Sequence, residues 1–389
     1  MTKEPSIEGK SKQNVAIVCD WLTEIGGGEK VILAVHEMFP EAPIYTSQYR
    51  PKRATWFDGC DVRTGRLNWL PQSIRRFTPF LRQWYFNRLD LSEYDVVISV
   101  TGAEAKSVKT VGKYGRATHI CYCHAPTQYY WSLYDQYMDN PGFGKILNPA
   151  VRLALKLLVR PLRKSDYRAA QRPDYFVANS SYVAGEIKKF YGRDSTVIWP
   201  GVAVDVVKRI KKTVSDVKRQ GFIISGRQVS WKRVDLAIGA CIKLNKQLLV
   251  VGDGPEHAQL VEQAHGHENI RFLPRYNGVS EIVEHFASAK AFLFPSLEPF
   301  GIVPVEALAA GTPVVALRKG GSLDFVEEGK NGVFFDEQTI DSVARAINRI
   351  ETMSFDASSV SRSVQKFSED NFRKQLYDLV KKASNESTT

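Results

Sequence analysis

The sequence predicts an α/β protein of two doubly wound domains, each with a parallel β-sheet between layers of helices. Short β-branched apolar runs recur about every 20 to 30 residues, and segments of helical period separate them. This alternation of expected strands and helices begins again after Pro200-Gly201 and a polar stretch over 208–220. The length of 389 residues also exceeds one ordinary core and suits two. We therefore predict an N-terminal domain over 1–205 and a C-terminal domain over 206–389.

The apolar runs mark the expected strands, and the carboxyl ends of two such sheets would face a central cleft where ligands bind. A segment near 367–382 indicates a final helix, the candidate to cross back to the N-terminal domain. The expected strands are 15–19, 44–47, 96–100, 119–123, 175–178 and 197–199 in the first domain, and 221–225, 248–252, 270–273, 291–294, 314–317 and 332–335 in the second.

The net charge of +11 lies mainly in the first half of the chain. Residues 1–200 hold 28 Lys and Arg against 19 Asp and Glu, whereas the remainder holds 25 against 23. Such a field attracts phosphates, whether of nucleic acid, nucleotides or anionic lipid, and charge alone does not choose among them. The five cysteines form no CxxC pair, so neither a disulfide framework nor a zinc site is indicated.

The most informative motif runs from Phe294 to Val315, from an expected strand through a glycine turn into a helix. Pro304 falls in the first helical turn, where a missing N–H costs nothing. The amides of Gly301, Ile302 and Val303 would then form an anion site made of main chain. Carboxylates at Glu298 and Glu306 could accept hydrogen bonds from hydroxyls of a sugar ring and of a ribose.

The Glu-x7-Glu arrangement resembles family 4 retaining glycosyltransferases, and the similarity extends over most of the chain. The resemblance implies the GT-B fold, with two Rossmann-like domains and a donor held mainly by the second. Ser225-Gly226-Arg227 with Lys232 is similar to the family's Gly-Arg-x4-Lys segment, in which the two cations clamp the donor diphosphate. Fixed cations suit a leaving nucleoside diphosphate, because they stabilise its growing negative charge without reorganising.

Further donor contacts are implied by the same resemblance. The turn at Gly252 would lie beneath the nucleotide, Phe300 belongs to the Glu298 loop, and Arg275 and Tyr276 would border the base. A dinucleotide site is excluded, because no G-x-G-x-x-G opens a helix with an acidic residue about 20 positions on, and no P-loop motif occurs.

The first domain carries the expected acceptor side. Its Gly26-Gly27-Gly28 loop opens a helix after the first strand, and its His124 follows another strand. Both segments resemble those of bacterial O-antigen and phosphatidylinositol mannosyltransferases, which implies a phosphate-facing loop and a histidine that touches the sugar. We predict catalytic roles for His124, Arg227, Lys232 and Glu298, donor contacts from Gly27 and Gly28, and an acceptor side formed by Asp20, Trp21, Tyr129 and Trp131.

Two stretches mix cations with apolar side chains. Residues 50–88 hold nine Lys and Arg against two acids, with Trp69, Phe77, Phe80, Trp84, Tyr85 and Phe86 interleaved, and residues 145–172 hold eight against one. Such mixtures suit an anionic bilayer surface, and they would also suit RNA. The N-terminus lacks the apolar core of a signal peptide, so we expect a cytoplasmic protein, peripheral on the inner face of the plasma membrane.

The family resemblance implies a hexosyltransferase, in the first place an α-mannosyltransferase that uses GDP-mannose and a lipid-linked or polysaccharide acceptor in cell-envelope glycan synthesis. No Asp-x-Asp motif stands in a suitable place, so we expect no metal and no cofactor beyond the nucleotide sugar. The enzymatic alternatives are a UDP-hexose-dependent transferase and a GT-B epimerase or hydrolase. A basic nucleic-acid binder is the non-enzymatic alternative, favoured only by charge, and we expect no nucleic-acid partner.

Overall fold

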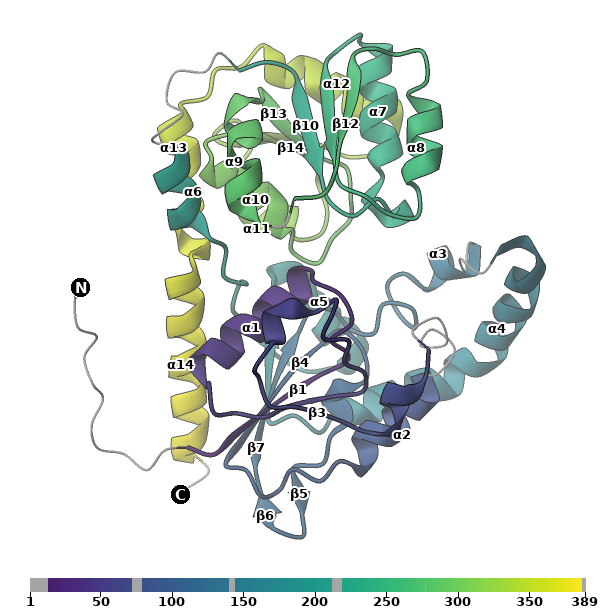
Figure 1. Cartoon of the computed structure of the whole chain (residues 1–389), viewed down its shortest axis with the longest axis vertical. Helices are drawn as coiled ribbons and strands as arrows, with labels where there is room; N and C mark the ends of the chain where they lie inside the picture. Colours follow the sequence, from purple (N-terminus) through teal and green to yellow (C-terminus); the bar gives the residue numbers. More distant parts are fainter. Residues whose placement is uncertain (1–12, 72–78, 140–143, 212–218, 277, 387–389) are drawn as a thin grey trace. The chain divides into compact units, whose positions relative to one another are not determined.

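The computed structural model describes residues 13–71, 79–139, 144–211, 219–276 and 278–386 (Figure 1). The chain divides into two compact units. Unit 1 runs to Val177 and also takes Phe190–Arg193 and the residues from Tyr377 onward, whereas unit 2 takes Ala178–Lys189 and Asp194–Leu376. The boundary near residue 205 and the return of the last helix stay predictions.

The first sheet has seven strands in the order β3-β2-β1-β4-β7-β8-β9. The pairs from β3 to β7 are all parallel. The strands β1, β4 and β7 are buried along their whole length, as expected for a parallel sheet covered on both faces. Their bounds are β1 Val15–Cys19, β2 Ile44–Thr46, β3 Val62–Thr64, β4 Val96–Thr101, β7 Thr118–Cys123, β8 Tyr175–Ala178 and β9 Thr196–Val197, and a separate antiparallel pair joins β5 Val111–Gly112 to β6 Gly115–Arg116.

Helices pack against this sheet and place loops at its carboxyl edge. The helix α1 contacts β1 and β4, and α2 contacts the short turn η4 that follows β4. One core cluster joins Val18 of β1 and Val97 of β4 to Phe86 of α2. The elements are α1 Gly27–Met38, η1 Thr55–Phe57, η2 Arg66–Trp69, α2 Pro79–Arg88, η4 Ala105–Ser107, α3 Tyr134–Asp139, α4 Gly144–Ala169 and α5 Ser181–Tyr191.

The sheet of unit 2 has six strands, all paired in parallel, in the order β12-β11-β10-β13-β14-β15. Its strands are β10 Phe222–Ser225, β11 Leu248–Val251, β12 Ile270–Leu273, β13 Ala291–Phe294, β14 Val314–Leu317 and β15 Gly332–Phe335. Its helical elements are α6 Val204–Lys211, η5 Ser230–Lys232, α7 Val234–Lys243, α8 His257–Gln263, α9 Val279–Ser288, α10 Ile302–Ala309, α11 Ser322–Phe325, α12 Ile340–Glu351, α13 Ala357–Arg362 and η6 Gln365–Phe367. The last helix is α14 Glu369–Glu386, whose residues from Tyr377 onward are assigned to unit 1.

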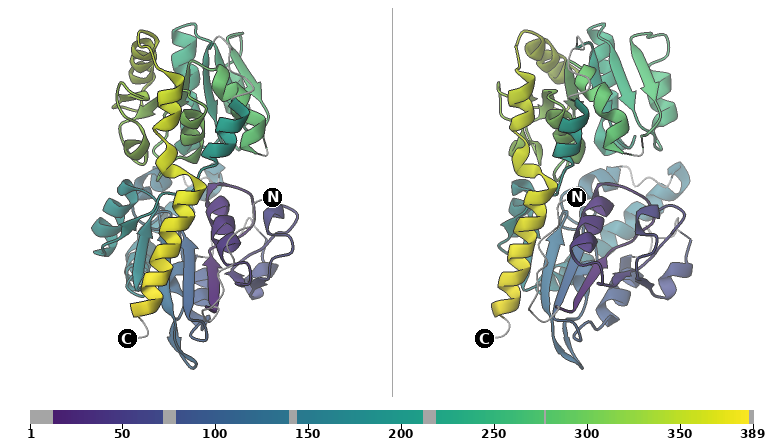
Figure 2. Two further views of the ribbon diagram at one scale, coloured as in Figure 1. Left: turned by 90° about the vertical axis from the view of Figure 1, so that its left-hand side faces the viewer. Right: turned by 60° about the vertical axis from the view of Figure 1, so that its left-hand side comes forward.

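Alternate residues of each unit 2 strand enter two separate cores, as the doubly wound prediction requires. Phe292 and Phe294 of β13 pack with α6, α9 and α10, whereas Leu293 packs with α7, α8 and α12. Figure 2 shows helices on both faces of this sheet. The predicted α/β class is therefore confirmed. Four predicted strands of unit 2, those over 270–273, 291–294, 314–317 and 332–335, match the observed bounds.

The sequence prediction missed β3 and the β5–β6 hairpin. Their apolar runs are too short or too mixed to stand out, since β3 has no buried residue and β5 and β6 are exposed throughout. In the described part of the chain, no helix combines the length and apolar content needed to cross a bilayer.

Candidate functional site

A hollow in unit 2 lies at the carboxyl ends of β10, β11 and β13. Parallel strands deliver the residues that follow them to one edge of the sheet, which is why distant motifs meet there. Three predicted residues, Arg227, Lys232 and Glu298, line this hollow together. Ser225 at the end of β10 and Ser296, two residues beyond β13, also line it.

The Lys232 ammonium binds the Glu298 carboxylate in this structure. Lys232 Nζ lies 2.5 Å from Glu298 Oε1, and Ser296 Oγ donates to the same oxygen at 2.8 Å. Both side chains of the pair are largely covered, with 23% of Lys232 and 17% of Glu298 exposed. An anion in the hollow would therefore meet a lysine that already has a carboxylate partner. Arg227, which lines the same hollow, is an exposed residue.

Glycines let the two loops under this hollow touch through their backbones. A Cβ on Gly252 would lie 2.1 Å from the Gly226 carbonyl oxygen, and one on Gly254 would lie 2.3 Å from that of Gln228. The buried Gln228 side chain ties the loops, because its Nε2 donates to Gly252 O at 3.0 Å and its Oε1 lies 2.7 Å from His257 Nδ1. The predicted turn at Gly252 therefore packs directly against the backbone of the loop that carries Arg227.

The loop from Glu298 to Gly301 depends on glycines as well. Gly301 precedes α10 with φ of +109°, and a Cβ there would lie 2.9 Å from the Phe294 ring. Gly320 and Gly321 pack on the other side of the loop, and Gly321 N donates to Glu298 O at 2.9 Å. The first amides of α10, at Ile302 and Val303, have no partner within the helix itself.

The remaining predicted donor residues differ in how accessible their side chains are. The Phe300 ring is 3% exposed and packs in the core against Phe325 and Phe367. Glu306 is buried inside α10 with 4% exposed. Tyr276 stacks on His285 and shares a 2.9 Å hydrogen bond with it, and Arg275 is exposed beside it. Phe300 can therefore act on a donor only through its backbone.

Unit 1 contains a separate cavity of about 270 Å³ at the carboxyl edge of its sheet. Glycine backbone and aromatic, polar and apolar side chains line it, and they come from β4, from the loops after β1, β4 and β7, and from α1 and α3. The predicted residues in this lining are Asp20, Trp21, Gly28, His124 and Tyr129. Gly27 is exposed at the start of α1 and Trp131 lies elsewhere, so neither is part of the lining.

His124 faces the start of α1 across this cavity. A Cβ on Gly28 would lie 3.4 Å from His124 Nε2, so glycine leaves the imidazole its space. Burial lowers the pKa of His124 to about 4, which keeps the ring neutral at pH 7. A neutral imidazole can exchange hydrogen bonds with a hydroxyl group but does not supply a positive charge.

Asp20 organises the loop that follows β4. Its carboxylate accepts hydrogen bonds from the Thr101 hydroxyl and from the amides of Gly102, Ala103 and Ala105, at 2.8 to 3.1 Å. Asp20 therefore shapes the edge of the cavity as well as lining it.

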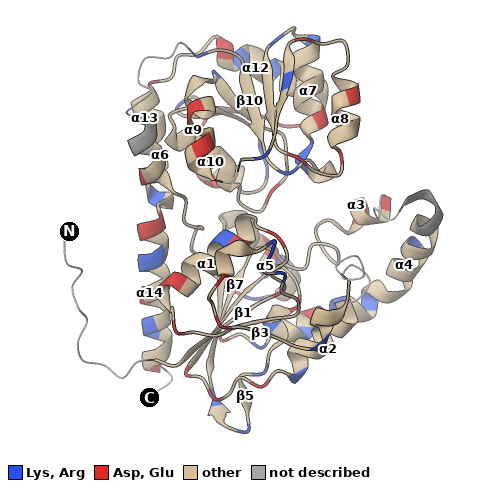
Figure 3. Cartoon of the chain, in the orientation of Figure 1, with Lys and Arg blue, Asp and Glu red and all other residues tan. Residues whose placement is uncertain are grey.

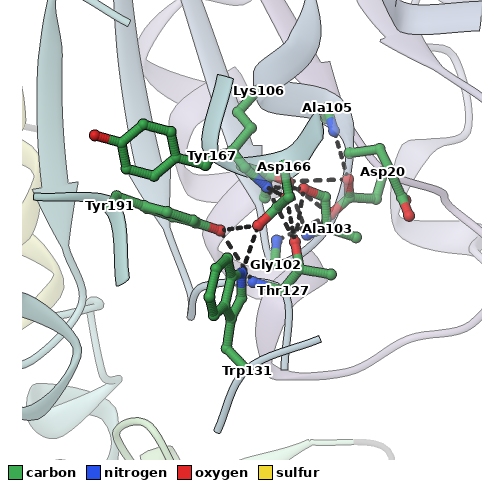
Figure 4. A network of polar contacts seen from close by, with 12 residues as sticks. Asp20, Gly102, Ala103, Ala105, Lys106, Thr127, Trp131, Asp166, Tyr167 and Tyr191 are labelled. Carbon is green, nitrogen blue, oxygen red and sulfur yellow. Dashed lines mark hydrogen bonds and ion pairs between the residues drawn. The ribbon is translucent and has the colours of Figure 1, made fainter. Parts of the chain in front are cut away.

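Trp131 belongs to a buried ion network (Figure 4). Lys106 Nζ lies 2.7 Å from Asp166 Oδ1, and both side chains are almost fully buried. The Asp166 carboxylate also accepts hydrogen bonds from Trp131 Nε1 and the Tyr191 hydroxyl at 2.7 Å and from Thr127 Oγ1 at 2.8 Å. The structure thus places Trp131 in the support of the cavity loops.

Comparison with known proteins agrees with this geometry. Residues 206–369 match the family model described as glycosyl transferases group 1. Mouse alpha-1,3/1,6-mannosyltransferase ALG2 is 23% identical over 413 residues, which cover 92% of this chain and 94% of that protein. Together these matches support a glycosyltransferase of the group 1, family 4 type, with the family model matched by the C-terminal part of the chain.

Two further comparisons concern a relative that matches over a shorter stretch and a solved structure with the same fold. The GDP-mannose-dependent alpha-mannosyltransferase of Corynebacterium glutamicum is 32% identical over 146 residues, covering 37% of this chain and 34% of that protein. The crystal structure of Anabaena HepE in complex with UDP matches with a TM-score of 0.70 at 19% identity, over 95% of this chain and 100% of that one. The predicted GT-B fold is therefore confirmed for this glycosyltransferase, and the family model with the mannosyltransferase relatives supports the predicted family.

Several residues that shape the two sites of this glycosyltransferase were missed by the sequence analysis. In unit 1 they are the charged residues Arg82, Glu104, Lys106 and Asp166, which form two buried ion pairs. A usable signal existed for two of them, because Glu104 and Lys106 follow the apolar run of β4 and so fall at the ligand-binding edge of the sheet. In unit 2 they are Gln228, His257, Ser296, Gly320 and Gly321.

The buried histidines of unit 1 predict that the glycosyltransferase loses stability in mild acid. Burial lowers the pKa of His119 and His124 to about 4, against about 6.5 in an unfolded chain. Between these values the unfolded state binds more protons, so stability is complete above pH 6.5 and is lost as pH falls toward 4. The expected slope is about 1 kcal/mol per pH unit for each histidine.

Urea unfolding of the wild type and His119→Gln at pH 7, 6 and 5 checks this expectation. The variant should show a shallower loss of stability with falling pH, because it lacks one of the titrating groups. The exposed His265 of unit 2 provides the control, and His265→Gln should follow the wild type. Equal slopes for wild type and His119→Gln would contradict the assignment.

Proposed function

We propose that this glycosyltransferase moves mannose from GDP-mannose to a glycan or lipid-linked acceptor, with retention of the anomeric configuration. The observation that carries the proposal is the meeting of Arg227, Lys232 and Glu298 at one hollow of unit 2. Two cations suit the diphosphate, and the carboxylate suits a sugar hydroxyl.

In the proposed reaction the acceptor hydroxyl attacks the sugar C1 from the face that the diphosphate leaves. The bond from C1 to the phosphate oxygen breaks, the bond from C1 to the acceptor oxygen forms, and a phosphate oxygen of the leaving group takes the hydroxyl proton. Arg227, Lys232 and the first amides of α10 stabilise the charge on the diphosphate. Glu298, held by Ser296, orients the sugar. No metal ion takes part in this scheme.

Two donors are supported by different relatives. The relatives named as mannosyltransferases, one of them GDP-mannose-dependent, favour GDP-mannose. The HepE structure contains UDP, which makes a UDP-hexose the second candidate. The sequence resemblance of the Gly26–Gly28 and His124 segments to mannosyltransferases decides our preference.

Competition between GDP-mannose and UDP-glucose at equal concentration tests the donor. We expect the mannosyl product to dominate by mass spectrometry, and the ratio should be unchanged in excess EDTA. Glu298→Ala should lower turnover by about 10²-fold and change GDP affinity little, because its proposed partner is the sugar. Glu268→Ala, at an exposed glutamate of unit 2, is the control. A mainly glucosylated product would refute the mannosyl assignment. Loss of activity in EDTA that magnesium then restores would refute the metal-free scheme.

We also propose that unit 1 binds an anionic membrane surface through α4. Leu153 and Leu157 on this helix are 59% and 68% exposed, and the cations Arg152, Lys156 and Arg160 beside them are exposed too. Figure 3 shows Lys and Arg along α4 and near α2. Exposed leucines among cations suit lipid headgroups, where the cations meet phosphate and the leucines enter the interface.

The α2 stretch contributes to the same proposal only in part. Phe80 and Trp84 of α2 are about half exposed, at 46% and 52%, and Arg88 lies 4.2 Å from the Trp84 ring centroid. Arg75, Arg76 and Phe77 lie outside the described residues. The α4 helix therefore provides the clearer test.

Sedimentation with vesicles measures this association. Wild type should bind vesicles with anionic lipid and not neutral ones, and binding should weaken with salt, since each surface cation contributes about 1 kcal/mol and is screened. Leu157→Gln should weaken binding severalfold, because it removes an inserted apolar side chain. Val261→Gln, at an apolar residue of α8 that is 43% exposed, should not. Equal binding to neutral and anionic vesicles would contradict the proposal.

A further inference from the structure

Two aromatic residues in the unit 1 cavity share one buried cation. Trp21 follows β1, Tyr129 follows β7, and both line the cavity. The guanidinium of Arg82, from α2, lies 5.4 Å from the Trp21 ring centroid, and its Nη2 lies 3.3 Å from the Tyr129 hydroxyl. Arg82 is 4% exposed, so this charge has left water to contact both rings.

Glu104 fixes this arginine. Arg82 donates from Nε to Glu104 Oε2 at 2.8 Å and from Nη2 to Oε1 at 3.0 Å, a two-pronged geometry that only a guanidinium can make. The Tyr129 hydroxyl donates to Glu104 Oε1 at 2.5 Å. Glu104 lies in the loop that Asp20 holds through three amides. The arginine therefore has a defined position relative to both aromatic residues.

A fixed aromatic wall suits a sugar ring. The flat face of an indole or phenol ring packs against the C–H groups of a pyranose, and Trp and Tyr lose little conformational entropy on binding. Rings held in place before the ligand arrives avoid the cost of ordering them during binding. Tyr137 extends the wall, with its ring edge-on to Tyr129 at 6.3 Å.

We propose that Arg82 is a positioning residue for the acceptor. It contacts Trp21, Tyr129 and Glu104 together and so holds the aromatic wall against which a sugar ring of the acceptor packs. The proposal rests on the proposed function, in which the unit 1 cavity is the acceptor side.

Two variants loosen the wall without removing a ring. Arg82→Lys keeps a cation for Glu104 but loses the two-pronged contact and the guanidinium over the Trp21 ring. Tyr129→Phe keeps the ring and loses only the hydroxyl that binds Glu104. Arg163→Lys is the matched control, because the Arg163 guanidinium also lies over an indole, 5.2 Å from the ring centroid of Trp131, which is outside the cavity lining.

The first measurement follows Trp21 directly, by fluorine NMR of protein labelled with 5-fluorotryptophan. The Trp21 signal is assigned by its disappearance in Trp21→Phe. It should shift or broaden in Arg82→Lys and stay unchanged in Arg163→Lys. A wild-type Trp21 signal in folded Arg82→Lys would overturn the proposal.

The second measurement uses GDP-mannose as donor and methyl α-mannoside as acceptor. Arg82→Lys and Tyr129→Phe should each raise KM for methyl α-mannoside by about tenfold, with kcat within twofold. The rate at which GDP is released from GDP-mannose in the absence of methyl α-mannoside should be unchanged, because neither substitution alters the hollow of unit 2. A parallel fall in that release, or an unchanged KM, would contradict the role. If the wild type does not use GDP-mannose, the proposed donor fails, and the Trp21 signal alone decides the role of Arg82.

Discussion

Arg227→Ala and Lys232→Ala should each lower the turnover of this glycosyltransferase by about 10²-fold, on the scale of losing one donor to the transition state. Both side chains line the hollow at the carboxyl ends of the unit 2 strands. For Lys232 the expected loss has two parts. The variant has no ammonium to bind the diphosphate. Glu298 also loses its ion pair, in which Lys232 Nζ lies 2.5 Å from Glu298 Oε1. Steady-state kinetics with GDP-mannose, or with whichever donor the competition selects, measures the effect.

A surface lysine with the same kind of partner provides the control. Lys243 Nζ lies 2.6 Å from Asp341, but both side chains are more than half exposed and lie outside the hollow. Lys243→Ala should keep turnover within twofold. Near-native turnover in folded Arg227→Ala and Lys232→Ala would show that the two cations do not carry the rate.

Asp166→Ala should destabilise unit 1 by about 3 to 5 kcal/mol, the usual cost of leaving one member of a buried ion pair alone. Burial by itself would lower the pKa of Lys106, but the Asp166 carboxylate outweighs it and raises that pKa well above its usual range. Without Asp166 this lysine would be buried with its charge uncompensated. Trp131 and Tyr191 would also lose the acceptor of their hydrogen bonds. Thermal unfolding should show a fall of roughly 10 °C.

The exposed pair of Lys188 and Asp194 is the control for burial. Its atoms are 2.8 Å apart, almost the same separation as in the buried pair, but 61% and 91% of the two side chains are exposed. Lys188→Ala should change stability by less than about 1 kcal/mol. If Asp166→Ala unfolds no earlier than Lys188→Ala, the buried network does not stabilise unit 1.

The sequence could indicate the Glu298 loop because its signals are local. A strand with four buried residues, a glycine and a proline three residues later specify a strand, a turn and a helix start without any distant contact. The observed φ of +109° at Gly301 agrees with that interpretation. The sequence could not predict the ion pair of Lys232 with Glu298, because the two residues are 66 positions apart and local patterns do not specify contacts at that separation.

Phe300 and Tyr276 show that the sequence also does not predict the direction in which a side chain points. Both stand within motifs that resemble donor contacts, yet the Phe300 ring packs in the core and the Tyr276 hydroxyl is bonded to His285. Motif spacing places a residue near a site, but the direction of its side chain depends on what the neighbouring elements offer. Contacts with α9 and with the core decided both cases.

The sequence by itself determined the two parallel sheets, the family and the loops at which ligand-binding residues gather, since apolar periodicity and glycine turns act over a few residues. Only the tertiary structure decided which charges are buried. Arg82 with Glu104 and Lys106 with Asp166 look like ordinary surface charges in the sequence, and each becomes costly to break because folding removes both partners from water. Burial is a property of the whole packed unit, so no local pattern specifies it.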